Sequence, residues 1–365
     1  MSSIPELKYK IMTPGPTMVR ENVRLARSLE CTNPDIDVEF VEFYKETCEI
    51  LSKCLHTKNE SLIMDGEGIL GLEAACASLT EPGDKVLVLD NGLYGAGFAD
   101  FVTMYGGIPT LYTTSYEEAI DVEGLRAFLS DNHDFKYATL VHCDTPSGML
   151  NPVEELSIVL HEYGIMTVVD SVSAMFGEPL DIDRGQFDIV CGGSQKALSA
   201  PPGLTFVVVS EQAKKAMDER KTPIASFYAN IRAFKTYYED KWFPYTMPIS
   251  DIYGFRTALD NFVEDTECFE RHAMVAEYTR NRLVENGIKL YGKNGYSNTV
   301  TAFCVPEGHT AGDILKRMRD EYGIMIAGSF GIFGDKLLRI GHMGEGAYVE
   351  NAKATLDAFF AVVGK

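Results

Sequence analysis

Two residues with reactive side chains follow predicted strands, at the point where each strand ends. Asp170 closes the apolar run 164–170, and Lys196 follows the run 187–191 through a Gly-Gly-Ser-Gln turn. Ligands of α/β sheets bind beyond the carboxyl ends of the strands, so we expect both side chains at one site. There a lysine amine can condense with a carbonyl, and a carboxylate can hold a cationic nitrogen.

That chemistry matches what a pyridoxal ring requires. The lysine would form a Schiff base with the aldehyde and later move a proton between Cα and C4′. The carboxylate would keep the pyridine nitrogen protonated, so that the ring accepts electrons from a carbanion. The alternative is a structural aspartate that caps a helix and a surface lysine after a glycine turn. Spacing alone leaves both interpretations open.

The elements that must position this pair form an alternating pattern. Apolar runs at 85–90, 137–142, 164–170, 187–191 and 203–209 predict buried strands. Helical patterns, such as those at 69–79 and 152–161, lie between the runs. This alternation predicts an α/β domain with a largely parallel sheet that is covered by helices on both faces.

The pattern changes near residue 260. A charged helical pattern at 265–286 leads into short strands, a second helix at 310–322, a strand near 336–341 and a last helix. This order is typical of a smaller α+β domain. We therefore expect a large domain over 1–259 and a small C-terminal domain over 260–365, with no Pro/Gly/Ser-rich linker between them.

Composition limits the partners of the chain. Its 365 residues are 45% hydrophobic, and its formal net charge is −20. A surface this acidic repels nucleic acid and anionic lipid, so neither is an expected partner. No apolar run approaches the 18 or so residues that a membrane-spanning helix needs. The segment Met1–Lys8 lacks the features of a signal peptide.

Eight cysteines are scattered along the chain without a CxxC pair. Several lie in apolar runs, as Cys191 does. This pattern is typical of reduced thiols in a cytoplasmic protein, rather than of a disulfide framework or a zinc site.

Three segments together resemble one known family. They are Gly193–Gly203 around Lys196, Thr13–Thr17 with its Pro-Gly-Pro, and Leu338–Gly341 around Arg339. They are similar to the class V aminotransferases, and most of all to the alanine–glyoxylate and serine–pyruvate branch. The resemblance implies fold type I, with a large seven-stranded-type, mostly parallel sheet domain and a small α+β domain. It further implies a homodimer or tetramer, a small amine and 2-oxo acid as substrates, and an N-terminal segment of about 35 residues near the active site.

Position by position, the resemblance assigns roles to residues of this chain. It implies Lys196 as the Schiff-base residue, Asp170 as the partner of the pyridine nitrogen and Arg339 as the clamp of the substrate carboxylate. Residues implied to contact the cofactor are Tyr94, Thr145, Gly68, Val172 and Gln195. Each role has a structural alternative: a core aromatic for Tyr94, a turn for Thr145 and an ion pair for Arg339.

One position departs from the pattern of phosphate binding. Most of the family holds the cofactor phosphate with a small hydroxyl residue before a helix. Here that position is Glu67. A phosphate near −2 placed 4 Å from a carboxylate is repelled by about 8 kcal/mol at an effective dielectric of 20. Protonating the glutamate at pH 7 costs about 3.7 kcal/mol instead. The alternative is that Glu67 turns to solvent.

A second departure agrees with the first. Phe243 lies where the alanine–glyoxylate branch offers a tyrosine hydroxyl to the phosphate of the neighbouring subunit, while Thr246 remains as a possible donor. This pattern resembles the pyridoxamine–pyruvate branch, which handles unphosphorylated vitamin B6. Glu67 would then accept a hydrogen bond from the free 5′-hydroxymethyl group.

The match with that branch is incomplete. It carries a second arginine where this chain has Phe330, whereas Gln195 and Ala197 are typical of ordinary class V enzymes. His342, beside the clamp, is open to an orienting or a structural role. A desulfurase would need a cysteine on a mobile loop, but Cys304 lies in the apolar run 300–305.

We therefore expect amino transfer from pyridoxamine to pyruvate, giving pyridoxal and alanine. The alternatives are a pyridoxal 5′-phosphate-dependent alanine–glyoxylate or serine–pyruvate enzyme, and a catalytically silent B6-binding protein.

Overall fold

A seven-stranded sheet forms the centre of the molecule. The computed structural model describes residues 8–365, so most of Met1–Lys8, on which the signal-peptide prediction falls, lies outside it. The strand order is β2-β10-β9-β8-β5-β3-β4. The strands are β2 (Glu60–Asp65), β3 (Lys85–Asp90), β4 (Ile108–Thr113), β5 (Tyr137–Val141), β8 (Met166–Asp170), β9 (Ile189–Gly193) and β10 (Leu204–Val209). β10 runs antiparallel to both of its neighbours, β2 and β9, and all other neighbouring strands of this sheet are parallel.

Helices surround this sheet. Those between residues 21 and 264 are α1 (Glu21–Ala26), α2 (Val38–Cys54), α3 (Gly68–Leu79), α4 (Leu93–Met104), α5 (Val122–Asp131), α6 (Val153–Glu162), α7 (Ile182–Gly185), α8 (Glu211–Asp218), η1 (Ile231–Phe234), α9 (Tyr237–Asp240) and α10 (Ile249–Glu264). A short hairpin of β6 (Cys143–Asp144) and β7 (Met149–Leu150) follows β5.

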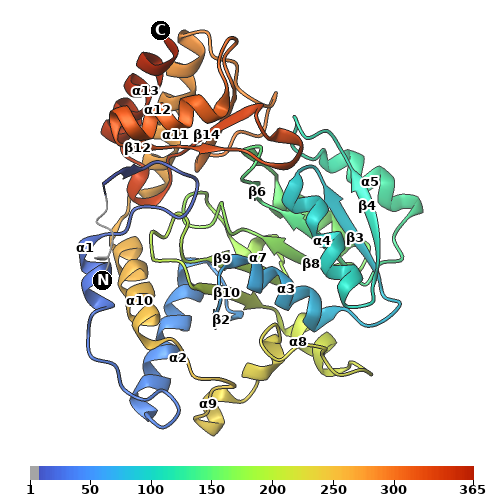
Figure 1. The fold of residues 1–365 in the computed structure, drawn as a ribbon. Helices are drawn as coiled ribbons and strands as arrows, with labels where there is room; N and C mark the ends of the chain where they lie inside the picture. The colour runs from blue at the N-terminus through green and yellow to red at the C-terminus, as the bar shows by residue number, and fades with distance from the viewer. Residues whose placement is uncertain (1–7) are drawn as a thin grey trace.

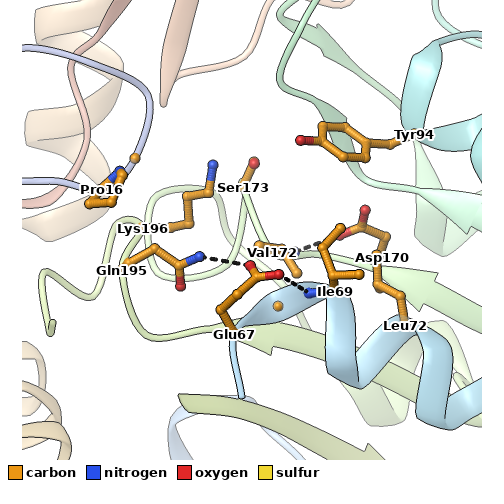
Figure 2. Close-up of a pocket in the computed structure, with 12 residues that line it drawn as sticks. Pro16, Glu67, Ile69, Leu72, Tyr94, Asp170, Val172, Ser173, Gln195 and Lys196 are labelled. Atoms are coloured by element: carbon orange, nitrogen blue, oxygen red, sulfur yellow. Dashed lines mark hydrogen bonds between the residues drawn. The ribbon is translucent and has the colours of Figure 1, made fainter. Parts of the chain in front are cut away.

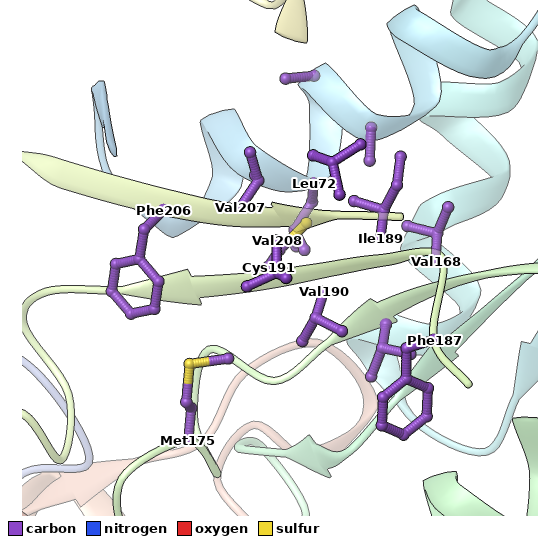
Figure 3. Packing of buried hydrophobic residues seen from close by; sticks show 14 of the residues in the cluster. Leu72, Val168, Met175, Phe187, Ile189, Val190, Cys191, Phe206, Val207 and Val208 are labelled. Carbon is purple, nitrogen blue, oxygen red and sulfur yellow. The ribbon is translucent and has the colours of Figure 1, made fainter. Parts of the chain in front are cut away.

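The core of the sheet is apolar on both faces. Figure 3 shows Val207 of β10 beside Leu72 of α3 on one face, and Phe206 and Val190 near Met175 on the other. All five side chains are buried. Strands covered on both faces need continuous apolar sequence, which is why these strands could be predicted from short hydrophobic runs.

The C-terminal part builds a second, smaller core. Its elements are α11 (Cys268–Glu285), β11 (Val300–Cys304), α12 (Ala311–Tyr322), β12 (Ile324–Met325), β13 (Ala327–Gly328), η2 (Gly331–Phe333), β14 (Leu337–Gly341), η3 (Gly344–Gly346) and α13 (Val349–Val363). β14 lies between β11 and β13, antiparallel to both. Apart from Met12, the buried residues of this second core lie between 283 and 363.

The N-terminal segment joins the two parts. β1 (Lys10–Ile11) pairs in parallel with β12, and the Met12 side chain is buried in the second core. Figure 1 shows this blue segment running along the lower edge of the C-terminal part. A few residues further on, the chain reaches the site described below.

The α/β architecture with a mostly parallel, seven-stranded sheet confirms the predicted fold class. The domain boundary at 259/260 stays a prediction, and α10 (Ile249–Glu264) continues across it. Among the described residues, no helix has the length and apolar character that crossing a membrane requires. All eight cysteines are free thiols.

Candidate active site

A pocket of about 180 Å³ lies where β8 and β9 end and α3 begins. Its lining residues are Gly15, Pro16, Glu67, Gly68, Ile69, Leu72, Tyr94, Asp170, Val172, Ser173, Gln195 and Lys196. Figure 2 shows the Lys196 amine and the Asp170 carboxylate on opposite sides, with Glu67 and Gln195 below them. Residues from distant parts of the sequence therefore share one cavity, as their strand-end positions predict.

Lys196 follows β9 and points its amine into this pocket. The Nζ atom donates a hydrogen bond to the Pro14 carbonyl oxygen at 2.7 Å. Burial lowers the pKa of Lys196 to about 8, against the opposing effect of the Asp170 charge. A larger fraction of the amine is therefore neutral near pH 7 than in an ordinary lysine, which favours attack on a carbonyl.

Asp170 ends β8, and its side chain is buried. Its Oδ1 accepts a hydrogen bond from the Val172 amide at 2.9 Å. Burial raises its pKa to about 7, because one backbone donor compensates only part of the lost hydration. A buried carboxylate with spare acceptor capacity is suited to pair with a cationic ring nitrogen.

Tyr94 lies in the first turn of α4, and its ring lines the pocket. Its backbone amide donates to Asp144 Oδ1 at 3.0 Å, which fixes the start of the helix. Thr145 is not among the lining residues. Its hydroxyl is hydrogen-bonded to Ser173, which does line the pocket.

Glu67 is the N-cap of α3, at the mouth of the pocket. Its Oε1 accepts from the Ile69 amide at 3.1 Å, and its Oε2 accepts from Gln195 Nε2 at 3.1 Å. The side chain is exposed to solvent, and it also lines the pocket (Figure 2). A carboxylate at a helix N-terminus interacts favourably with the helix dipole, so Glu67 itself occupies the position that suits an anion.

Two neighbours complete this end of the pocket. Gln195 Oε1 is buried without a hydrogen-bond partner. Gly68 packs so closely on Val172 that a Cβ atom at residue 68 would lie 2.9 Å from the valine methyl groups. Both predicted positions, Gly68 and Val172, line the pocket.

Arg339 lies on β14, and its guanidinium is held by backbone oxygens. Nε and Nη2 donate to the Gly328 carbonyl at 2.9 and 2.5 Å, and Nη1 donates to the Thr145 carbonyl at 3.2 Å. A guanidinium has five N–H donors, so one remains on each terminal nitrogen for a bidentate carboxylate. Arg339 does not line the pocket, but Thr145, whose carbonyl it contacts, is hydrogen-bonded to the lining residue Ser173.

Two predicted residues do not reach this pocket. The Phe243 ring is buried in an aromatic cluster, 4.9 Å from the Tyr44 ring and 5.5 Å from the Tyr237 ring. The ring is interior in this chain, so its contact with a cofactor stays a prediction. Thr246 is exposed and donates to Asp35 Oδ2 at 3.2 Å. Its contact with a partner's cofactor stays a prediction.

Two further candidates, His342 and Cys304, are held within the fold of the C-terminal part. His342 is fully buried between the Thr301 hydroxyl at 2.7 Å and the Asn298 carbonyl at 3.1 Å, and burial lowers its pKa to about 3. Such a histidine stays neutral and holds β14 against the segment before β11. Cys304 is part of β11 rather than of a loop.

Sequence reasoning did not assign a site role to five of the lining residues, namely Gly15, Pro16, Ile69, Leu72 and Ser173. Ser173 follows Asp170 by three positions, so its place after a strand end was a usable signal. Gly15 was quoted only as part of a motif. Its φ is +94°, and a Cβ atom there would lie 2.5 Å from Lys196 Cδ. Glycine is thus required for the close approach of the N-terminal segment to the lysine.

The fold and this site define a fold type I transferase. The sequence profile of the class-V aminotransferases matches residues 33–334. The pyridoxamine–pyruvate transaminase of Mesorhizobium japonicum is 33% identical over 329 residues, covering 89% of this chain and 84% of the relative. The alanine–glyoxylate aminotransferase of Rattus norvegicus is 30% identical over 369 residues, covering 98% of this chain and 87% of the relative.

A solved structure agrees with these relatives. The alanine–glyoxylate aminotransferase from Nostoc sp. superposes with a TM-score of 0.95 at 26% identity, covering 100% of this chain and 97% of that chain. The chain belongs to the class V aminotransferases. It is therefore an aminotransferase, as its sequence predicts.

The family implies dependence on a pyridoxal cofactor, and the residues of the pocket fit the ring of such a group. A buried amine and a buried carboxylate face one cavity, which Tyr94 also lines. The mouth of the pocket is less suited to a phosphate, because Glu67 already places a carboxylate on the N-terminus of α3.

Proposed function

We propose that this enzyme transfers the amino group of pyridoxamine to pyruvate, producing pyridoxal and alanine. The single observation that carries the proposal is the position of Glu67. Its carboxylate caps α3 and is held by Gln195 at the mouth of the pocket. That arrangement favours a ligand with a neutral hydroxymethyl group over one with a phosphate.

The chemistry of the hydroxymethyl group supports this assignment. A hydroxyl donates one hydrogen and accepts others, whereas a phosphate only accepts near neutral pH. Glu67 offers acceptor oxygens to the ligand hydroxyl. The Gln195 side-chain amide offers both a donor and an acceptor. The unpartnered Gln195 Oε1 is a further acceptor in the same place.

The proposed roles of the other residues follow from their surroundings. A bound pyridoxal ring supplies the electron sink for amino transfer. Lys196 is the attachment point, and its Nζ carries the proton that moves during the reaction. Asp170 would hold a proton at the ring nitrogen, and Tyr94 and Val172, which line the same pocket, would help to hold the ring. Arg339 orients the carboxylate of the 2-oxo acid.

Ser173 and Thr145 act together in this proposal. Their hydroxyls are hydrogen-bonded to each other, and the Thr145 carbonyl also accepts from Arg339. The loop that holds the clamp is thereby tied to the wall of the pocket.

A second candidate is a pyridoxal 5′-phosphate-dependent alanine–glyoxylate or serine–pyruvate enzyme. Gln195 and Ala197 favour it, because these neighbours of Lys196 are typical of ordinary class V enzymes. Similarity to the rat alanine–glyoxylate enzyme supports it as well. It requires a phosphate to bind beside the Glu67 carboxylate, which has the same sign of charge.

A homodimer in the cytoplasm is also part of the proposal. Three aromatic side chains are largely exposed in the single chain: Phe227 (64%), Tyr228 (50%) and Trp242 (60%). The Tyr228 ring stacks on Tyr245, whose hydroxyl accepts from the Asp65 amide just before Glu67. A second subunit that covers these rings would bury an exposed aromatic surface. The free cysteines support a reducing compartment.

The test is turnover by the purified enzyme. We expect alanine and pyridoxal to form from pyruvate and pyridoxamine. We expect much slower turnover when pyridoxamine 5′-phosphate replaces pyridoxamine. A protein purified with a tightly bound phosphorylated chromophore, active with alanine and glyoxylate, would support the second candidate instead.

A further inference from the structure

The Phe330 ring is close to both Tyr94 and Arg339. Its ring centroid is 6.2 Å from that of Tyr94, in an edge-to-face arrangement. The same centroid is 5.8 Å from Arg339 Cζ. The side chain is 47% exposed, so a large apolar surface remains beside the clamp. A substrate whose carboxylate binds Arg339 must place its remaining atoms near this surface or near Lys196.

The segment that carries Phe330 is held in place on three sides. Gly328 supplies the carbonyl that accepts from Arg339, and the Ser329 hydroxyl donates to the Pro146 carbonyl at 2.9 Å. At Gly331 the backbone approaches Leu93 so closely that a Cβ atom would lie 3.0 Å from its side chain. The Phe330 ring is therefore part of a fixed wall.

Few cations are available near this wall for a second carboxylate. The Arg339 guanidinium beside Phe330 would already hold the first carboxylate. Among the residues that line the neighbouring pocket, Lys196 is the only cation, and it is required for the reaction. Glu67 is acidic, and the whole chain carries a net charge of −20. A distal carboxylate that meets the Phe330 ring would lose water without gaining a partner, which is costly.

We propose that Phe330 sets the class of amino acceptor: small monocarboxylic 2-oxo acids with a short apolar side chain are accepted, and dicarboxylic ones are rejected. This inference rests on the proposed amino transfer to a 2-oxo acid. The phenyl ring packs against the methyl end of the acceptor and excludes water from its clamp. The ring also faces the Arg339 guanidinium, which stabilises the clamp by a cation–π contact.

The test compares kcat/KM for four acceptors: pyruvate, 2-oxobutyrate, oxaloacetate and 2-oxoglutarate, with pyridoxamine as the donor. We expect the parent enzyme to prefer the first two. Phe330→Arg should raise the value for the dicarboxylic acids relative to pyruvate by about tenfold or more, because it adds a charged partner for the second carboxylate. Ile332→Arg is the matched control, since it adds the same charge to an exposed position two residues away.

A binding measurement separates recognition from turnover. Propionate and glutarate cannot react, so calorimetry can measure their dissociation constants. In Phe330→Arg the affinity for glutarate relative to propionate should rise, as the relative kcat/KM for dicarboxylic acceptors does. Phe330→Leu removes the ring and keeps an apolar wall, and should raise the KM for pyruvate severalfold while monocarboxylic preference persists. Equal use of pyruvate and 2-oxoglutarate by the parent, or an equal shift in Ile332→Arg, would overturn the role of Phe330. A parent that uses no 2-oxo acid would instead refute the proposed function.

Discussion

The two ends of the pocket differ in how they relate to the rest of the family. The reactive end, made of Lys196, Asp170 and Tyr94, has the amine, carboxylate and aromatic ring that amino transfer requires. The anchoring end is made of Glu67, Gly68 and Gln195. It retains the N-terminus of α3, but the Glu67 carboxylate caps that N-terminus. On the proposed function, reaction type and cofactor form are specified by separate groups of residues. Each end can therefore be altered while the other is monitored.

The largest effect is expected at the reactive end. Lys196→Ala removes both the attachment point and the proton carrier, so turnover should fall by about four orders of magnitude or more. Alanine production from pyridoxamine and pyruvate measures it. Lys353→Ala, at an exposed position on α13, is the control and should keep parental activity. Parental turnover by the Lys196 variant would contradict the assigned mechanism.

The next effect concerns the anchoring end. Glu67→Thr removes the carboxylate and supplies a hydroxyl at the start of α3, so the affinity for pyridoxal 5′-phosphate relative to pyridoxal should rise by about two to three orders of magnitude. Equilibrium titration followed by absorbance measures both affinities. Glu67→Gln keeps the size of the side chain and should give an intermediate ratio. An unchanged ratio in both variants would mean that Glu67 does not select the cofactor form.

A smaller effect is expected at the clamp. Arg339→Lys keeps the charge but loses the two parallel N–H donors, so the KM for pyruvate should rise by about ten- to a hundredfold. The dissociation constant for pyridoxal serves as the internal control, because Arg339 lies outside the lining of the pocket, and it should stay unchanged. A KM that does not move would exclude Arg339 as the carboxylate partner.

The smallest effect is the pH dependence of the reactive end. Because the pKa of Lys196 is lowered to about 8, the rate of its reaction with added pyridoxal should rise about tenfold per pH unit below that value and level off above it. Asp170 opposes this lowering, so Asp170→Asn should move the midpoint to lower pH. Stopped-flow absorbance measures the profile. A midpoint near 10.5 in the parent would show that burial does not perturb this lysine.

The sequence predicts the reactive end better than the anchoring end for a physical reason. Buried parallel strands require continuous apolar runs, so the ends of β8 and β9, and with them Asp170 and Lys196, are visible in the sequence. By contrast, β4 is an edge strand with an exposed, irregular pattern, and it was not predicted. Nor does an apolar run indicate direction, so the antiparallel orientation of β10 became visible only in the fold.

Side-chain orientation limits what the sequence can predict at the anchoring end. The unusual Glu67 was visible, but whether it faces solvent or ligand depends on Gln195, which is 128 positions away. Similarly, the burial of Phe243 depends on packing against Tyr44 of α2, which is far away in the sequence. Such long-range contacts are set by the tertiary structure and not by local pattern.

The most direct measurement of the central claim is the mass of the adduct on Lys196. The purified enzyme is offered equal concentrations of pyridoxal and pyridoxal 5′-phosphate, reduced with borohydride, digested and analysed by mass spectrometry. We expect a pyridoxyl group on the peptide that contains Lys196. A phosphopyridoxyl group there, as the main product, would contradict the claim that this aminotransferase selects unphosphorylated vitamin B6.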